Sequence, residues 1–485
     1  MARLSRLSRL SRLSVRSRRR LAVLPAPLLA LLLTAACSAD HGGAGGGAGG
    51  GGAGAAPSPS DAGPGAIVVA SGRDVTGKNG VRQQLIDAWN ERQKRAGTGY
   101  HARLVELPGS ADEQRSQLLG ALQSGSASYD VVNLDVTWVP EFAAARLIRP
   151  LSRTMIDGDV IASVARTATW DGQVYAVPFN SDVGLLYYRR DHLEQAGVQE
   201  PELDAGLDWA RLESLIDTVN DHRPEGYKKG WTTQLAAYEG RTVNAVEAFA
   251  SAVPGLELTD EQGRYRATVE QLTRGIAELR RRTADPYTLR PEAESSDEDA
   301  SLDDFTDGRT AFLRHWPYAY GTLHQSFDDR QLGVVPLPGR AVLGGQNLAV
   351  TGTSQRAAKA AELIRFLTGR ESERCLLDAG FAATRTSAYE DDQVRCTVAA
   401  SVPSASPTGE SADRMPRDKA GRPAYARRIL YGALKDAVPR PRTPLYGAFT
   451  QTFTARLGAL FSDSPPSDAE LAKSLDEALR GALPD

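Results

Sequence analysis

Residues 66–89 read AIVVASGRDVTGKNGVRQQLIDAW, and this stretch decides the fold. The run from Ala66 to Ala70 is apolar without a break, which is typical of a strand buried on both faces of a sheet. After a turn-like segment, apolar residues recur at helical spacing from Val81 to Trp89. The stretch therefore predicts a strand, a loop and a helix in that order.

The same unit repeats further along the chain, with a strand at 100–107, a helix at 112–124 and a strand at 129–135. Alternating strands and helices predict an α/β lobe with a largely parallel sheet. The ligand crevice of such sheets lies beyond the carboxyl ends of the strands. The polar and aromatic residues expected there are Arg73, Asp74, Asp135 and Trp138.

The chain has 485 residues and a formal net charge of -3. The part from 66 to 485 is too long for one ordinary core, which favours two lobes. The weak net charge argues against a nucleic-acid surface or a general basic membrane patch. We also expect a monomer.

The N-terminal residues have the pattern of an export signal. Residues 1–20 hold eight arginines and no acidic residue, and the apolar run that follows is too short to span a membrane. Small residues then precede Cys37, and the segment 1–36 resembles a bacterial lipoprotein signal peptide, in which the cysteine is lipidated. Two acyl chains are enough for stable anchoring. A secreted protein with an unmodified cysteine is the alternative, and export through the Sec or the twin-arginine route remains open.

Residues 37–65 are rich in Gly, Ala, Ser and Pro, which predicts a disordered linker between the anchor and the fold. The expected location is therefore the extracellular face of the cytoplasmic membrane. Cys375 and Cys396 are the two remaining cysteines. In an oxidising compartment a disulfide between them is expected, and two free thiols are the alternative.

Several short motifs occur in a fixed order, namely WDGQVYAVPF at 170–179, LLYYRRD at 185–191, DWARL at 208–212, FTDGRTAFLRHWPY at 305–318, GVVPLP at 333–338 and GGQNLAV at 344–350. Together they resemble the family-1 extracellular solute-binding proteins of ABC importers, closest to the trehalose- and maltose-binding group. A helix at 357–369 follows the motifs.

The resemblance implies two α/β lobes with discontinuous boundaries and a hinge between them. We expect lobe 1 at about 66–179 and 343–375, lobe 2 at about 183–340 and 380–485, and hinge strands at 179–182 and near Gly344. It further implies a sugar, most simply a di- or oligosaccharide, as ligand and the transmembrane subunits of an ABC permease as partner. No enzymatic activity, cofactor or metal is implied.

Sugar sites combine strong hydrogen-bonding side chains with flat aromatic platforms. The resemblance assigns Asp182 to a contact beside the hinge and Trp316 to the platform; a solvated turn and a core tryptophan are the alternatives. Further contacts implied in the same way are Tyr238, Glu239, Gln346 and Tyr446. Departures from the group are His315, where Asn is common, and Gln346, where an aromatic residue is common.

The acidic run 292–304 lacks the glycine and the spacing of a calcium loop, so a solvated surface insertion is expected there. Two rival functions remain. One is a secreted glycoside hydrolase, if Asp135, Asp182 and Glu239 converge as a carboxylate pair. The other is a ligand sensor for a membrane kinase, built on the same fold.

Overall fold

The computed structural model describes residues 62–73, 80–125, 127–203, 206–285, 287–288, 292–398 and 413–484. The predicted signal peptide, Cys37, most of the predicted linker and Asp74 lie outside these residues. Among the helices in these ranges, none has both the length and the apolar composition of a membrane span.

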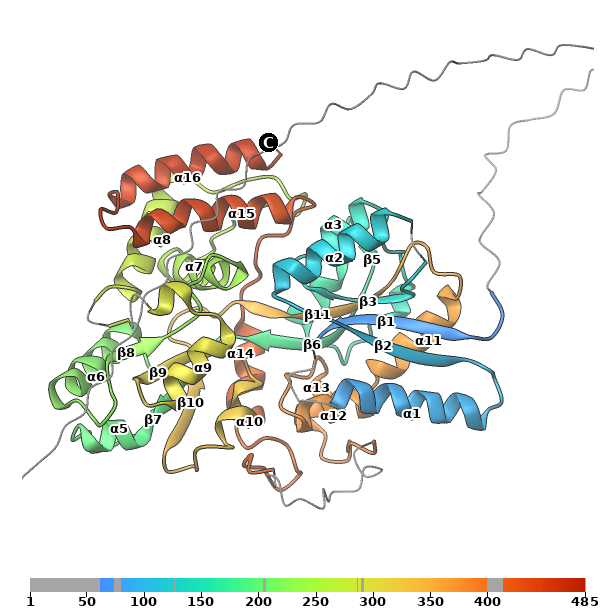
Figure 1. Ribbon diagram of the computed structural model, residues 1–485, viewed down its shortest axis with the longest axis horizontal. Coiled ribbons are helices and arrows are strands. Elements are labelled where there is room, and N and C mark those ends of the chain that lie inside the picture. Colours follow the sequence, from blue (N-terminus) through green and yellow to red (C-terminus); the bar gives the residue numbers. More distant parts are fainter. Residues whose placement is uncertain are drawn as a thin grey trace, which may run out of the picture. The chain divides into compact units, whose positions relative to one another are not determined.

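A five-stranded sheet forms the first lobe (Figure 1). Its order is β2 (His101–Leu107), β1 (Ala66–Gly72), β3 (Val131–Asp135), β11 (Leu343–Val350) and β6 (Val177–Val183). The pairs β1–β2 and β1–β3 are parallel, as predicted, whereas β11 is antiparallel to both β3 and β6. Four of the five strands, β2, β1, β3 and β6, therefore run in one direction, which agrees with the expectation of a largely parallel sheet. Strand β11 alone runs in the opposite direction, because it enters the sheet from the second lobe.

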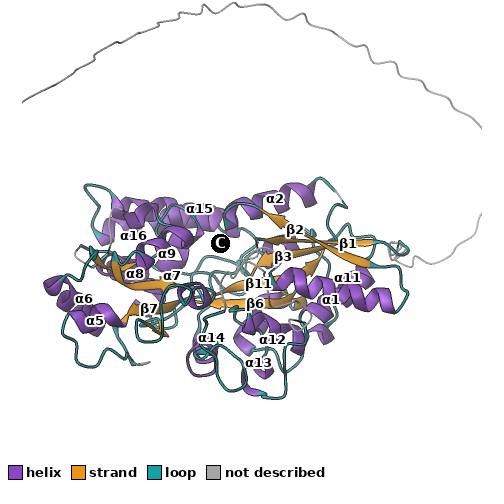
Figure 2. Cartoon of the chain, turned by 60° about the horizontal axis from the view of Figure 1, so that its bottom comes forward, coloured by secondary structure: helices purple, strands orange, loops and turns teal. Residues whose placement is uncertain are grey.

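Helices cover both faces of this sheet (Figures 1 and 2). Along β1, Ile67 and Val69 pack in one apolar cluster with α1, whereas Ala70 belongs to the cluster on the other face. This alternation follows from the two-residue period of a strand. The helices of the first cluster are α1 (Val81–Arg95), α11 (Ala357–Leu367) and α12 (Arg370–Asp378), and those of the other face are α2 (Ala111–Gln123) and α3 (Val139–Ala144).

A four-stranded sheet forms the second lobe. Its order is β10 (Leu332–Pro336), β7 (Leu185–Arg189), β9 (Thr310–His315) and β8 (Lys229–Thr232), and only the pair β8–β9 is parallel. Its larger helices are α6 (Trp209–His222), α7 (Glu239–Ala252), α8 (Val269–Arg282), α9 (Glu298–Thr306), α15 (Tyr446–Leu457) and α16 (Asp468–Ala482). The remaining elements are α4 (Ala162–Ala165), β4 (Thr169–Trp170), β5 (Gln173–Val174), α5 (Arg190–Gln195), α10 (Ala319–Leu323), α13 (Thr386–Glu390) and α14 (Tyr431–Asp436).

The expectation for the acidic run 292–304 was wrong in part. Residues Glu298–Thr306 form α9, whose start is capped by the Asp297 side chain, and Leu302 and Phe305 are buried in the core of the second lobe. Because Leu302 and Phe305 lie among many acidic residues, the sequence holds only a weak sign that they are buried. Residues 298–304 of the run therefore belong to a helix of the second lobe rather than to a solvated insertion.

The chain first crosses between the two sheets at a single residue, Gly184, which lies between β6 and β7. A Cβ at this position would overlap a carboxylate oxygen of Glu247 on α7. Glycine at this position leaves room for the Glu247 carboxylate and the Arg314 guanidinium beside the crossing strand. The chain returns from β10 to β11 and leaves again after α14, where Val342 and Val438 form an isolated bridge.

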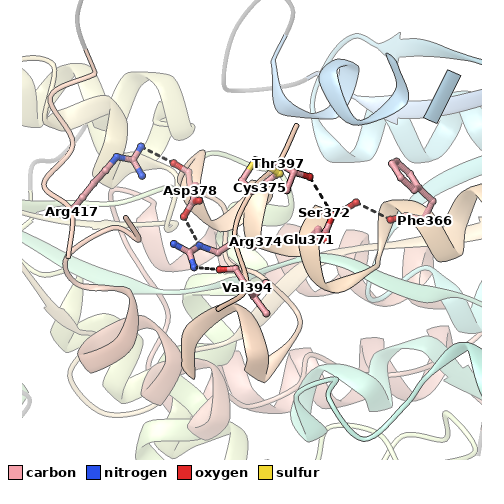
Figure 3. Close-up of a disulfide and its surroundings, with 10 residues drawn as sticks. Phe366, Glu371, Ser372, Arg374, Cys375, Asp378, Val394, Thr397 and Arg417 are labelled. Atoms are coloured by element: carbon pink, nitrogen blue, oxygen red, sulfur yellow. Dashed lines mark hydrogen bonds and ion pairs between the residues drawn. A yellow bond between two sulfur atoms is a disulfide. The ribbon is translucent and has the colours of Figure 1, made fainter. Parts of the chain in front are cut away.

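The expected disulfide is present between Cys375 on α12 and Cys396 (Figure 3). The Cα atoms are 4.6 Å apart, and Cys375 is buried. Arg374 reaches the Val394 carbonyl, and the Thr397 hydroxyl donates to Glu371, so hydrogen bonds hold the same loop on both sides of Cys396. The bridge thus fixes the loop after α13 onto α12.

Candidate functional site

A guanidinium group connects the two lobes at the centre of the molecule. Arg440, in the segment between α14 and α15, donates to both carboxylate oxygens of Asp135 at 2.9 Å and to Glu239 at 2.6 Å. Asp135 ends β3 of the first lobe, and Glu239 begins α7 of the second. Arg440 is buried, so this bridge lies in a desolvated part of the interface.

Glu239 has three donors around it. Besides Arg440, the hydroxyls of Tyr446 and Thr450 on α15 donate to its carboxylate. Burial raises the pKa of Glu239, and the nearby guanidinium of Arg440 opposes that rise. Tyr446 is fully buried, so its ring packs in the core while its hydroxyl completes this network.

Helix α2 of the first lobe also meets the second lobe. Its Asp112 faces the backbone N–H of Glu239; burial raises the pKa of Asp112, and that N–H opposes the rise. Arg115 pairs with Glu141 on α3, and a Cβ at Gly447 of α15 would overlap the Arg115 guanidinium. The lobes are therefore in direct contact around Glu239.

Trp316 follows β9 and is half-buried at this interface. The Arg314 guanidinium lies 3.9 Å from its ring centroid, and a buried ion pair of 2.6 Å holds Arg314 to Glu247. The indole N–H donates to Glu298 at 3.4 Å. A cation therefore covers one face of the ring.

The Trp316 ring is also fixed from α9. Glu298 accepts a 2.8 Å hydrogen bond from Tyr238, so the carboxylate joins two aromatic side chains of the second lobe. His315 is buried beneath them with its Nε2 3.2 Å from the Glu298 carbonyl oxygen. Burial lowers the pKa of His315 to about 3, so the ring is neutral at physiological pH.

Asp182 lies on β6, where it pairs with Gly344 of β11. A Cβ at Gly344 would lie 3.1 Å from the Asp182 Cβ and 3.4 Å from the Trp316 ring, so both side chains adjoin the same glycine. Burial raises the pKa of Asp182 to about 7, against the lowering effect of Arg82 nearby.

A buried polar network lies on the first-lobe side. Gln346 is the register partner of Asp135, and its side-chain oxygen accepts from Asn133 and, at 2.9 Å, from Arg82. Arg82 also donates to Asn180 at 3.2 Å. This network links α1 to strands β3, β6 and β11 next to Asp182.

The structure brings most of the predicted site residues together, and we call this group the inter-lobe site. Its members are Asp135, Asp182, Tyr238, Glu239, Trp316, Gln346 and Tyr446. Trp138 packs in the adjoining core against Phe142, and Arg73 is exposed at the end of β1. Asp74 lies outside the described residues.

Sequence reasoning missed the residues that connect these groups, which are Arg82, Glu298, Arg314 and Arg440. Glu298 was hidden in the acidic run, and Arg440 stands in a proline-rich stretch without periodicity. Within the described ranges, no group of three His, Cys, Asp or Glu side chains is arranged to hold a metal ion.

Residues 84–401 match the family described as bacterial extracellular solute-binding protein. A probable ABC transporter-binding protein of Deinococcus radiodurans is 28% identical over 391 residues, which cover 78% of this chain and 83% of that protein. A mannitol-binding protein of Pseudomonas aeruginosa is 24% identical over 141 residues, or 28% of this chain and 31% of the relative.

Solved structures share the fold. Maltose-bound MalE3 of T. maritima aligns with a TM-score of 0.67 at 23% identity, covering 86% of this chain and all of the other. The GacH receptor of Streptomyces glaucescens, solved unliganded and with acarbose, aligns with a TM-score of 0.67 at 20% identity, covering 87% of this chain and 98% of that one. At these identities the likeness concerns the two-lobed α/β fold.

Proposed function

We propose that this chain, which belongs to the family of bacterial extracellular solute-binding proteins, captures a sugar between its two lobes and delivers it to the permease of an ABC importer. Members of the family are binding components rather than enzymes. The names of the relatives and neighbours support a carbohydrate or polyol as ligand, since they include maltose, acarbose and mannitol.

One observation carries the proposal: an aromatic side chain and a carboxyl that has no hydrogen-bond partner among the described residues adjoin the same glycine between the lobes. Arg314 lies over the Trp316 ring, and both Trp316 and the Asp182 Cβ lie beside Gly344. An aromatic face binds the C–H surface of a sugar, and a carboxylate accepts its hydroxyl protons. We expect a di- or oligosaccharide, as bound by the trehalose- and maltose-binding group, with Tyr238 and Gln346 as its remaining predicted contacts.

The hydrolase alternative is less well supported. A retaining pair needs a second carboxylate free to act as nucleophile about 5 Å from the acid. Glu239 and Asp135 are both held by Arg440. Proton donation by Asp182 alone does not make such a pair.

We further propose that Cys37 carries a lipid anchor, that residues 37–65 form the tether, and that the monomeric protein works at the outer face of the cytoplasmic membrane. The export-type leader and the family of extracellular proteins support this. Replacing Cys37 by alanine should move the protein from the membrane fraction to the soluble fraction with its melting temperature unchanged. Retention of the variant in the membrane would contradict the anchor.

Calorimetric titration with a panel of maltose, trehalose, lactose, mannitol and acarbose tests the ligand class. At least one sugar should bind with a one-to-one stoichiometry, and the exposed-surface variant Asp436→Asn should bind it equally. If no member of the panel binds and a thermal melt shows the protein folded, the sugar assignment is wrong.

A further inference from the structure

Glu298 lies between two aromatic side chains of the inter-lobe site. Its carboxylate accepts a 2.8 Å hydrogen bond from the Tyr238 hydroxyl and a 3.4 Å hydrogen bond from the Trp316 indole N–H. The two rings come from different elements, since Tyr238 precedes α7 and Trp316 follows β9. A single carboxylate therefore contacts the polar edges of both rings.

The backbone around Glu298 is fixed by further hydrogen bonds. The Asp297 side chain accepts from the N–H of Ala300 and so caps the start of α9. The Glu298 carbonyl accepts from the Ser301 hydroxyl at 3.0 Å and lies 3.2 Å from Nε2 of His315 on β9. These contacts hold the first turn of α9 beside β9, so the Glu298 carboxylate has a defined position next to the rings.

Helix α9 also supports the guanidinium that lies over the Trp316 ring. The Ser301 hydroxyl accepts from the Gln234 amide at 2.7 Å. Gln234 donates to the Arg314 carbonyl at 3.1 Å and accepts from the Arg314 guanidinium at 3.3 Å. Helix α9 thus contacts Trp316 directly at the indole N–H and indirectly at the ring face.

This arrangement uses the polar hydrogens of both rings. A phenol and an indole each have one polar hydrogen. Because Glu298 accepts both of them, Tyr238 and Trp316 present carbon surfaces to a ligand rather than hydrogen-bond donors. The orientation of these surfaces then depends on the position of the Glu298 carboxylate.

We propose that Glu298 is a positioning residue of the inter-lobe site: its carboxylate orients Tyr238 and Trp316, and through them it sets the affinity for the ligand without contacting the ligand itself. This inference rests on the proposed function, because it concerns the same site. In Glu298→Ala both hydrogen bonds are lost. In Glu298→Gln one carboxylate oxygen becomes an NH₂ group, which cannot accept from a ring.

The test is calorimetric titration of the full chain with maltose, or with the panel sugar that binds most tightly. Glu298→Ala should weaken binding about tenfold, the size expected for the loss of hydrogen bonds to a charged group, and Glu298→Gln should weaken it less. The matched control Asp299→Asn also removes one charge from the first turn of α9, at an exposed side chain, and should bind like the parent. Equal affinity of Glu298→Ala and the parent would overturn the proposal.

A double variant distinguishes positioning from a general loss of packing. Tyr238→Phe removes one of the two hydrogen bonds from the side of the ring. Two changes that act through the same contact are not additive. Tyr238→Phe should therefore weaken binding in the parent and cause no further loss in the Glu298→Ala background. Losses that multiply would overturn the proposal, because they would mean that the two side chains act independently.

A second measurement needs no ligand. Acrylamide should quench the tryptophan fluorescence of Glu298→Ala more strongly than that of the parent, because the Trp316 ring loses its contact with α9. The increase should be absent in Asp299→Asn and in a Trp316→Phe background. Glu298→Gln, which keeps the shape of the side chain, replaces Glu298→Ala if that variant does not fold.

The two measurements separate this inference from the proposed function. If quenching changes as expected and no panel sugar binds, the positioning role stands and the sugar assignment fails. If a sugar binds and the Glu298 variants change neither quenching nor affinity, the positioning role fails and the sugar assignment stands.

Discussion

Replacing Asp182 by asparagine should stabilise the unliganded protein, and by more at pH 8 than at pH 5. Burial raises the pKa of this carboxyl from 3.8 to about 7, so the folded state disfavours its ionised form. Such a group supports the fold below its unfolded pKa, and this contribution is lost as the pH rises through the folded value. Asparagine has nearly the same shape and carries no charge at either pH.

The size of the effect follows from the two pKa values. Between pH 5 and pH 8 the ionisation of Asp182 should cost the folded state a further 2–3 kcal/mol, or about 3 °C in melting temperature for a fold of roughly 420 residues. Because Asp182 is half-buried rather than fully enclosed, this figure is an upper limit. Changes in packing that do not depend on pH cancel when the two pH values are compared.

The assay is thermal denaturation of parent, Asp182→Asn and Asp436→Asn at both pH values without ligand. The melting temperature difference between Asp182→Asn and the parent should be larger at pH 8, and Asp436→Asn should show no such trend. A difference that is the same at both pH values, or larger at pH 5, would refute the reasoning. It would mean that burial does not outweigh the stabilising effect of the nearby guanidinium groups on the ionised Asp182 carboxyl.

Three further outcomes are expected. Trp316→Ala should weaken sugar binding at least tenfold, about 1.4 kcal/mol, and lower the melting temperature little, whereas the buried-core control Trp209→Ala should lose about 3–5 kcal/mol of stability; an equal loss in both would make Trp316 a core residue. Removing both Cys375 and Cys396 should lower the free energy of unfolding by about 3 kcal/mol without changing sugar affinity, as measured by denaturation and calorimetry; a changed affinity would connect the loop to the site. Arg440→Met should cost about 3–5 kcal/mol because it leaves a buried carboxylate unpaired, and adding Glu239→Gln should recover part of the loss; a single variant as stable as the parent would count against the bridge.

The local elements of the first lobe could be predicted well from sequence. The strands at 66–72, 101–107 and 131–135 and the helices between them were predicted from apolar runs and from the spacing of apolar residues. The structure adds a capping box of Ser110 and Glu113 at the start of α2. The acidic run around α9 was misjudged because two apolar residues among many carboxylates give a weak periodic signal. The prediction for that run relied on its acidic composition and not on the spacing of its apolar residues.

The connections within the site could not be predicted. Arg440 contacts Asp135 across 305 positions of sequence, and nothing local to Pro439-Arg440-Pro441 indicates a buried ion bridge. The resemblance to a family supplied positions such as Trp316 and Asp182, but the guanidinium that lies over the Trp316 ring depends on tertiary packing. Pairings of this kind are decided by the fold rather than by neighbouring residues.

The crossing between the lobes at Gly184 is directly connected to the residues around Trp316. Gly184 adjoins the Glu247 carboxylate, Glu247 pairs with Arg314, and Arg314 lies over the Trp316 ring. A continuous series of contacts thus connects the crossing to the aromatic side chain. Substitutions meant to alter ligand preference without disturbing the crossing between the lobes should therefore be made at Tyr238 and Gln346. The residues around Gly184 should be left unchanged.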